Sequence, residues 1–325
     1  MPAILLAAAL SVATVQTVHL PLPQTPDQHL AVHCVAPARP TDRSVLFVHG
    51  ASFPTLLASG FAFAPGDSWL ADVARRGYLA CGLDFLGFGD ASRPPAMAGE
   101  AAGEPLTRAS QAAAQIALAV DWLRTVRGMK TVHLVAHSWG TIPAAAYAAT
   151  RPPALASLTL FGPIVPKAGV TDEPVRSAWW NITAQQRYRQ LRYADVLPHG
   201  TVLLEPAVDA RWAGRFAASA PHVAGDPPGQ LRIPSGPLAD LADAEAGRYP
   251  YAAKEVRVPL FVVYGDYDTV VDDTGAAAFL ARFTGSPLRW KLRIDPGTHV
   301  MHLERARHSL YASVAAFIEA AEARP

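Results

Sequence analysis

The sequence predicts an α/β domain: a mostly parallel, doubly wound β-sheet interrupted by one inserted, mainly helical segment. Short apolar runs of strand length alternate with helical stretches, the alternation stops near Pro166, and it resumes after residue 255. Half of the 325 residues are hydrophobic and 17% are charged, which is enough apolar material for a large core. We therefore expect a core domain from residues 1–166 and 256–325, and an insertion at 167–255.

The first half of the chain begins with an expected β-hairpin, formed by two extended segments at residues 14–23 and 28–37. The strands that follow are continuous apolar runs, which are typical of strands buried on both faces. The clearest helix, Thr107 to Arg127, gathers alanine, leucine and isoleucine on one face. The expected elements after the hairpin are strand 43–50, helix 68–78, a strand from Tyr78 that runs into a Gly-rich loop, helix 107–127, strand 131–137, helix 141–153 and strand 155–163.

The second half contains the insertion and the end of the core. Residues 167–255 are richer in proline, arginine and aromatic residues, and we expect helices joined by long loops there. The core then continues with strand 258–268, helix 274–283, strand 288–295 and a closing helix from about His308.

Composition argues against several classes of partner. The formal net charge is +1 and no basic run occurs, so we do not expect nucleic acid binding. No Cys/His cluster has metal-ligand spacing, and no motif signals an organic cofactor. Beyond the N-terminal stretch no apolar run is long enough to span a bilayer, so we expect no stable membrane association. The expected partner is a small-molecule substrate, and the oligomeric state stays open.

Residues 1–16 are apolar and resemble a signal peptide in length, followed by small residues. They lack the positively charged region that normally precedes such a stretch. An N-terminal extension of a cytoplasmic protein is therefore favoured over an export signal.

The two cysteines, Cys34 and Cys81, lie in runs that read as strands. We expect them to be small buried side chains. A disulfide stays open as the alternative, because the two runs could lie side by side in one sheet.

Ser138 is the candidate nucleophile. It follows an apolar strand and precedes a helix in "LVAHSWGT", with Ala136 and Gly140 two residues to either side. A tight strand-to-helix turn with small residues at these positions holds a serine hydroxyl clear of the sheet, as in the G-x-S-x-G elbow. Ala136 departs from that pattern by one methyl group. The alternative interpretation is an ordinary helix N-cap serine.

An acid and a base follow Ser138 at the ends of later strands. Asp268 ends "LFVVYGDYD" and would orient a histidine, with Asp266 as its rival. His299 lies in the turn of "DPGTHVMHLE", with His302 as its rival at a helix start. The carboxyl ends of parallel strands meet at one edge of a sheet, so these residues are expected to converge.

Two backbone amides are candidates for an oxyanion hole. The Ala51 amide follows the strand and glycine of "FVHGAS", and the Trp139 amide follows Ser138 at a helix start. His49 is interpreted as a structural residue that bonds neighbouring loops.

The motifs "VHGAS", "DFLGFGDASRP", "AHSWG", "GDYD" and "GTHVMHLE" resemble, in order and spacing, those of the α/β-hydrolase fold superfamily. The resemblance covers roughly residues 17–166 and 256–320, and 167–255 would match its variable cap domain. It implies an α/β-hydrolase fold and a cofactor-independent serine hydrolase of esterase-like or proline iminopeptidase-like type. It also implies that Ser138 is the nucleophile, that His299 is the general base and that Asp268 is the acid that orients it. The backbone amides of Ala51 and Trp139 would form the oxyanion hole. The family pattern G-x-x-D favours Asp268 over Asp266.

The resemblance also bears on the reaction. "DFLGFGDASRP" is like the corresponding stretch of epoxide hydrolases and dehalogenases, but those enzymes have an aspartate at the elbow, and Ser138 indicates acyl chemistry. "SWG" is like proline iminopeptidases, whose elbow begins Gly-Gly where this chain has Ala-His. An aminopeptidase would need cap carboxylates, for which Glu205 and Asp209 are candidates.

Aromatic residues suggest what the substrate looks like. If they line the cleft, the substrate has a large apolar or aromatic part; otherwise they join cap to core. We predict hydrolysis of an ester or a lactone, with an amidase or aminopeptidase, or a C–C bond hydrolase, as the alternative. A non-catalytic binder is disfavoured because Ser, Asp and His are all retained. The candidate pocket residues are Ser52, Phe53, Phe61, Phe63, Trp179 and Trp180.

Overall fold

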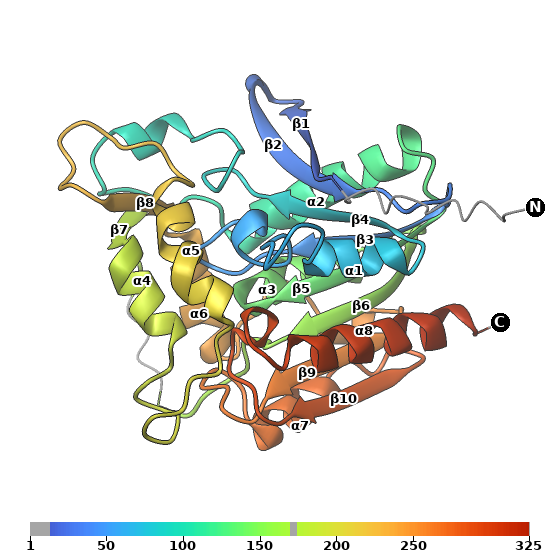
Figure 1. Ribbon diagram of the computed structural model, residues 1–325. Coiled ribbons are helices and arrows are strands. Elements are labelled where there is room, and N and C mark those ends of the chain that lie inside the picture. Colours follow the sequence, from blue (N-terminus) through green and yellow to red (C-terminus); the bar gives the residue numbers. More distant parts are fainter. Residues whose placement is uncertain (1–13, 170–173, 325) are drawn as a thin grey trace, which may run out of the picture.

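The computed structural model describes residues 14–169 and 174–324, and its centre is an eight-stranded sheet (Figure 1). The strand order is β1-β2-β4-β3-β5-β6-β9-β10. β1 and β2 form the expected hairpin and β2 pairs antiparallel with β4, whereas all the other pairs are parallel. The strands are β1 (Gln16–Leu22), β2 (Thr25–Val35), β3 (Arg43–Val48), β4 (Leu79–Asp84), β5 (Thr131–His137), β6 (Leu155–Phe161), β9 (Leu260–Gly265) and β10 (Arg289–Ile294).

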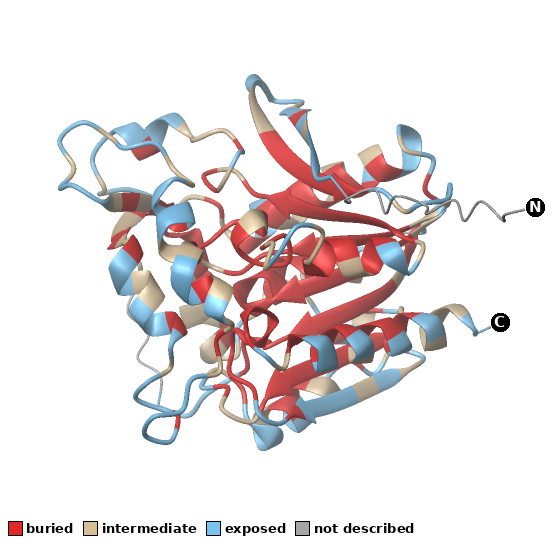
Figure 2. Ribbon diagram, in the orientation of Figure 1, coloured by how far each residue is buried: buried red, intermediate tan, exposed pale blue. Residues whose placement is uncertain are grey.

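Helices cover both faces of the sheet, and the central strands are buried along almost their whole length (Figure 2). Successive strand residues point to opposite faces, so Leu46 and Val48 of β3 join one apolar cluster while Val45 and Phe47 join the other. The first cluster includes α2 (Ala109–Thr125), α3 (Thr141–Ala149) and α7 (Asp273–Ala281), and the second includes α1 (Trp69–Arg75) and α8 (Arg307–Glu322). This two-sided burial explains why the strands are continuous apolar runs.

The insertion contains α4 (Ala184–Leu191), α5 (Pro206–Ala217) and α6 (Gly236–Glu245), as expected. It also contains a two-stranded antiparallel sheet, β7 (Trp179–Thr183) with β8 (Gln230–Pro234), which the sequence analysis did not predict. The β7 residues have strand propensity, but their partner lies far along the chain. Short 3-10 helices complete the described elements: η1 (Thr55–Leu57), η2 (Pro95–Ala98), η3 (Ser138–Gly140), η4 (Ala253–Glu255) and η5 (Met301–Leu303).

Asp240 of α6 fastens the insertion to the core. Its buried carboxylate accepts hydrogen bonds from the Trp139 indole at 2.9 Å, the Ala109 amide at 2.6 Å and the Arg108 guanidinium at 2.6 Å. The Ala109 amide is among the first N–H groups of α2, and these groups have no acceptor inside the helix. The insertion thus meets the core beside the turn that carries Ser138.

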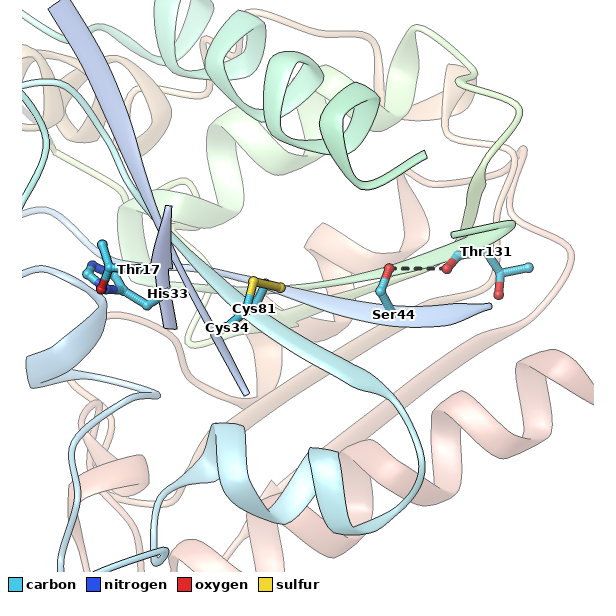
Figure 3. The surroundings of a disulfide bond; sticks show 6 residues. All are labelled: Thr17, His33, Cys34, Ser44, Cys81 and Thr131. Atoms are coloured by element: carbon cyan, nitrogen blue, oxygen red, sulfur yellow. Dashed lines mark hydrogen bonds between the residues drawn. A yellow bond between two sulfur atoms is a disulfide. The ribbon is translucent and has the colours of Figure 1, made fainter. Parts of the chain in front are cut away.

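Cys34 and Cys81 form a disulfide between β2 and β4 (Figure 3). This corrects the expectation of two unlinked buried thiols. The strands pair antiparallel with the two cysteines directly opposite each other, a register that the sequence did not reveal.

The apolar stretch 1–16 lies almost wholly outside the described residues. Within the described ranges, no helix combines the length and the apolar character needed to cross a bilayer.

Candidate active site

Ser138 lies at the sharp turn between β5 and η3, which leads into α3. Its φ of 55° is in the left-handed region, which costs a non-glycine residue about 1–3 kcal/mol and is concentrated at functional sites. The turn is packed closely: a Cβ added to Gly140 would lie 2.3 Å from the His49 carbonyl oxygen, and one on Gly50 would lie 3.0 Å from Ser138 Cβ. The Ala136 methyl packs in the core, so the departure from the elbow pattern is accommodated.

Ser138, His299 and Asp268 form one continuous hydrogen-bonded chain. His299 Nε2 lies 2.8 Å from Ser138 Oγ, and His299 Nδ1 lies 3.0 Å from both carboxylate oxygens of Asp268. All three side chains are buried. The serine is thereby placed to give its proton to the imidazole, whose charged form the carboxylate would stabilise.

Asp266, the rival of Asp268, and His302, the rival of His299, are not part of this hydrogen-bonded chain. β9 ends at Gly265, so residues 266–268 form a turn instead of continuing the strand alternation. Asp266 accepts a hydrogen bond from the Gly297 amide at 2.8 Å and does not contact His299. His302 lies in η5 against Phe53, Phe161 and His137, and its ring nitrogens have no hydrogen-bond partner within the described residues. Burial lowers the pKa of His302 to about 3, so it is neutral.

The two candidate oxyanion amides belong to the segments on either side of the contact between Gly50 and Ser138. Trp139 is the second residue of η3, where N–H groups have no partner inside the helix. Ala51 follows Gly50, whose backbone lies against Ser138. His49 contacts the Gly50 carbonyl at 2.8 Å and accepts from the Phe85 amide at 3.4 Å, and so links two loops.

Gly162 was missed by the sequence analysis. It follows β6, has φ +56°, and supports the acid–base pair by its lack of a side chain. A Cβ there would lie 2.8 Å from His299 Nδ1 and 3.1 Å from Asp268 Oδ2. Only the tertiary packing shows this requirement.

Gly162→Ala is therefore expected to lower kcat/KM for any substrate of Ser138 by about 10²-fold, because the methyl group separates His299 from Asp268. Gly128→Ala is the matched control, since Gly128 has φ +71° and open space around its Cβ position. Equal losses in both variants would show that backbone strain, and not the contact with His299, is responsible.

Glu304 is a second residue that the sequence analysis missed. Its carboxyl group is buried and accepts hydrogen bonds from the Thr298 amide at 3.1 Å and from the Thr298 hydroxyl, beside His299. Burial raises its pKa to about 7 from an ordinary 4.5. In the folded protein the carboxyl group is therefore mostly protonated below about pH 7.

The folding free energy should reflect this raised pKa. A carboxyl group that holds its proton more tightly when folded stabilises the protein fully below pH 4.5, and that contribution falls as the pH rises to about 7. We expect wild type to lose about 3 kcal/mol relative to Glu304→Gln between pH 4.5 and 7.5, measured by urea unfolding. Exposed Glu319→Gln controls for the loss of one charge, and a flat difference for Glu304→Gln would contradict the prediction.

The candidate pocket residues divide into two groups. Phe53 and Phe61 are buried; Phe53 packs edge-on against Trp212 of α5, and Phe61 packs against Phe63. Trp179 belongs to a separate cluster with Met97 and Ala178, and the Arg232 guanidinium covers its ring. Ser52 is buried, whereas Trp180 is half-buried. Phe53 and Phe61 of the core thus contact Trp212, Arg211 and Arg215 of the insertion, and Trp179 of the insertion contacts Met97 of the core.

The two cap carboxylates considered for an aminopeptidase are already engaged. Glu205 is ion-paired with Arg307, and Asp209 accepts a hydrogen bond from the Tyr188 hydroxyl. Across the described residues, no group of three or more His, Cys, Asp or Glu side chains is arranged to hold a metal ion.

Comparison with known proteins gives a family and a fold. Residues 44–306 match the sequence profile of a family described as alpha/beta hydrolase fold, and no curated protein matches the chain. A thioesterase domain from the curacin biosynthetic pathway is 17% identical, with 94% of this chain and 99% of that chain covered and a TM-score of 0.58. E-2-(acetamidomethylene)succinate hydrolase is 17% identical (94% and 100% covered, TM-score 0.57), and an esterase of Pyrococcus furiosus is 13% identical (94% and 92%, TM-score 0.55). Identities this low show a shared fold alone.

Proposed function

Because this chain belongs to the alpha/beta hydrolase fold family, we propose that it is a serine hydrolase that cleaves an ester or a lactone of a hydrophobic or aromatic small molecule through an acyl-enzyme. The observation that carries the proposal is the chain of hydrogen bonds from Ser138 through His299 to Asp268, with Ser138 held at φ 55°. The solved esterase and thioesterase of the same fold agree with acyl transfer.

The proposed reaction has two halves. His299 Nε2 takes the Ser138 proton as Oγ attacks the substrate carbonyl, and the amides of Ala51 and Trp139 bind the oxyanion. The oxyanion then collapses, the C–O bond of the ester breaks, and His299 returns its proton to the departing alcohol. Water, deprotonated by His299, attacks the acyl-enzyme and releases the acid and free Ser138. Asp268 stabilises the imidazolium in both halves.

An amidase, an aminopeptidase or a C–C bond hydrolase would use the same three side chains. The aminopeptidase alternative needs a free carboxylate to bind a substrate ammonium group. Glu205 and Asp209 are already bonded to Arg307 and Tyr188, so the ester reaction is preferred.

The test is hydrolysis of p-nitrophenyl esters from acetate to dodecanoate, alongside aminoacyl p-nitroanilides and a vinylogous diketone, with fluorophosphonate labelling of the intact protein. We expect ester hydrolysis, a chain-length optimum that reports the pocket size, and a single label on Ser138. Labelling of Ser138 without ester hydrolysis would favour cleavage of an amide bond or a C–C bond. A folded protein that neither reacts nor labels would overturn the proposal and restore the non-catalytic binder.

A further inference from the structure

Arg187 of α4 carries a positive charge that the described residues leave uncompensated. Its Nη1 donates to Gln190 Oε1 at 2.6 Å, while its Nε is buried and has no hydrogen-bond partner. No carboxylate of the described residues lies within ion-pairing distance of this guanidinium, whereas Arg108, Arg232 and Arg307 each bond to one. A buried donor without a partner is rare and costly, and a cation without a carboxylate partner favours an anionic ligand.

The neighbours of Arg187 place its guanidinium beside the Ser138 site. It lies 5.6 Å from the centre of the Phe53 ring, in the loop that begins with the oxyanion amide of Ala51. Burial is the main cause of the lowered pKa of His137, the residue before Ser138, and the charge of Arg187 contributes to it. The guanidinium thus contacts the loop that contains Phe53 and lies within electrostatic range of His137.

Tyr193 interacts electrostatically with both Arg187 and Asp268. Burial is the main cause of its raised pKa, the Asp268 carboxylate raises it further, and the Arg187 guanidinium opposes both. One tyrosine thus lies within electrostatic range of Asp268 and of Arg187. Burial also lowers the pKa of Arg187 itself, so an anion beside it would be favoured.

With Nη1 bonded to Gln190 and Nε enclosed by protein atoms, Nη2 is the guanidinium donor left for a ligand among the described residues, and a cationic donor of this kind favours a carboxylate oxygen. We propose that Arg187 binds a carboxylate of the substrate, so that the ester cleaved at Ser138 carries a negative charge on its acyl or alcohol part. This inference rests on the proposed function and adds a substrate class to it.

A different role for Arg187 would have a different signature. If its guanidinium stabilised the oxyanion, it would accelerate the hydrolysis of charged and neutral esters alike. A carboxylate site instead changes the ratio between the two, so the ratio of kcat/KM values is the quantity to measure.

The experiment uses two ester pairs that differ only in charge. p-Nitrophenyl hemisuccinate and its methyl ester place the charge on the acyl part; 4-acetoxybenzoate and its methyl ester place it on the leaving group. In at least one pair, Arg187→Gln should lower the ratio of charged to neutral kcat/KM by about 10- to 100-fold, with Arg187→Lys in between. Arg189→Gln, exposed on the same helix, should keep the wild-type ratio. An unchanged ratio in both pairs for Arg187→Gln would overturn the inference.

A binding measurement separates this inference from the proposed function. In Ser138→Ala, which cannot form an acyl-enzyme, calorimetric titration with p-nitrophenyl hemisuccinate and 4-acetoxybenzoate should show affinity that falls about 10-fold or more on adding Arg187→Gln. Hydrolysis of neutral esters combined with no Arg187-dependent binding would leave the hydrolase standing and reject the carboxylate site. Arg187-dependent binding without any hydrolysis would support the carboxylate site and reject the hydrolase.

Discussion

Ser138→Ala is expected to lower kcat for ester hydrolysis by about 10⁴-fold or more and to abolish fluorophosphonate labelling, because no other hydroxyl contacts His299 Nε2 in the described residues. The substitution keeps the backbone and removes one oxygen, so circular dichroism and the thermal midpoint should stay close to wild type. The measurement is kcat and KM with the p-nitrophenyl ester that wild type prefers.

The control is Thr159→Val, which removes another buried hydroxyl, on β6. Thr159 Oγ1 has no hydrogen-bond partner among the described residues, so its loss should change kcat by only a few fold. Substantial residual activity in Ser138→Ala, with wild-type KM, would place the nucleophile elsewhere and remove the basis for an acyl-enzyme at this turn.

Asp268→Asn should lower kcat by about 10³- to 10⁴-fold while the protein stays folded. A carboxylate accepts a hydrogen bond from the Nδ1–H group of His299, which keeps the ring proton on Nδ1 and leaves Nε2 free to take the Ser138 proton. An asparagine amide can instead donate to Nδ1, which puts the ring proton on Nε2 and blocks that transfer. The loss should therefore appear in kcat at every pH where wild type is active.

Asp266→Asn is the matched control for this prediction. Asp266 lies two residues away and accepts from the Gly297 amide, a bond that an asparagine oxygen can also accept. We expect activity within about threefold of wild type. If the two substitutions exchanged their effects, the carboxylate that orients His299 would be Asp266, and the assignment from the G-x-x-D pattern would be wrong.

The fold class was predictable because it depends on local patterns. Continuous apolar runs and amphipathic helices recur in an order that few topologies satisfy, and the sheet and the family are confirmed. The positions of Ser138, Asp268 and His299 were predictable for a related reason: each follows a strand, and parallel strands end at a common edge.

Other features depend on segments that meet only in the folded chain. The pairing of β7 with β8 and the disulfide between Cys34 and Cys81 are set by strand register, which the hydrophobic pattern does not encode across long separations. Strand alternation cannot separate Asp266 from Asp268, because residues two apart in a strand point to the same face; the two are separated by the turn that follows Gly265.

The sequence by itself determined that this chain is an α/β protein with an insertion, and that a serine, an acid and a base follow its strands. The tertiary structure alone showed how closely Asp268 meets His299, why Gly162 has no side chain, and that Arg187 has a buried donor without a partner among the described residues. The physical reason is range. Hydrophobic periodicity and turn propensity act over a few residues and are written along the chain, whereas desolvation, charge pairing and steric contact arise between residues that folding brings together.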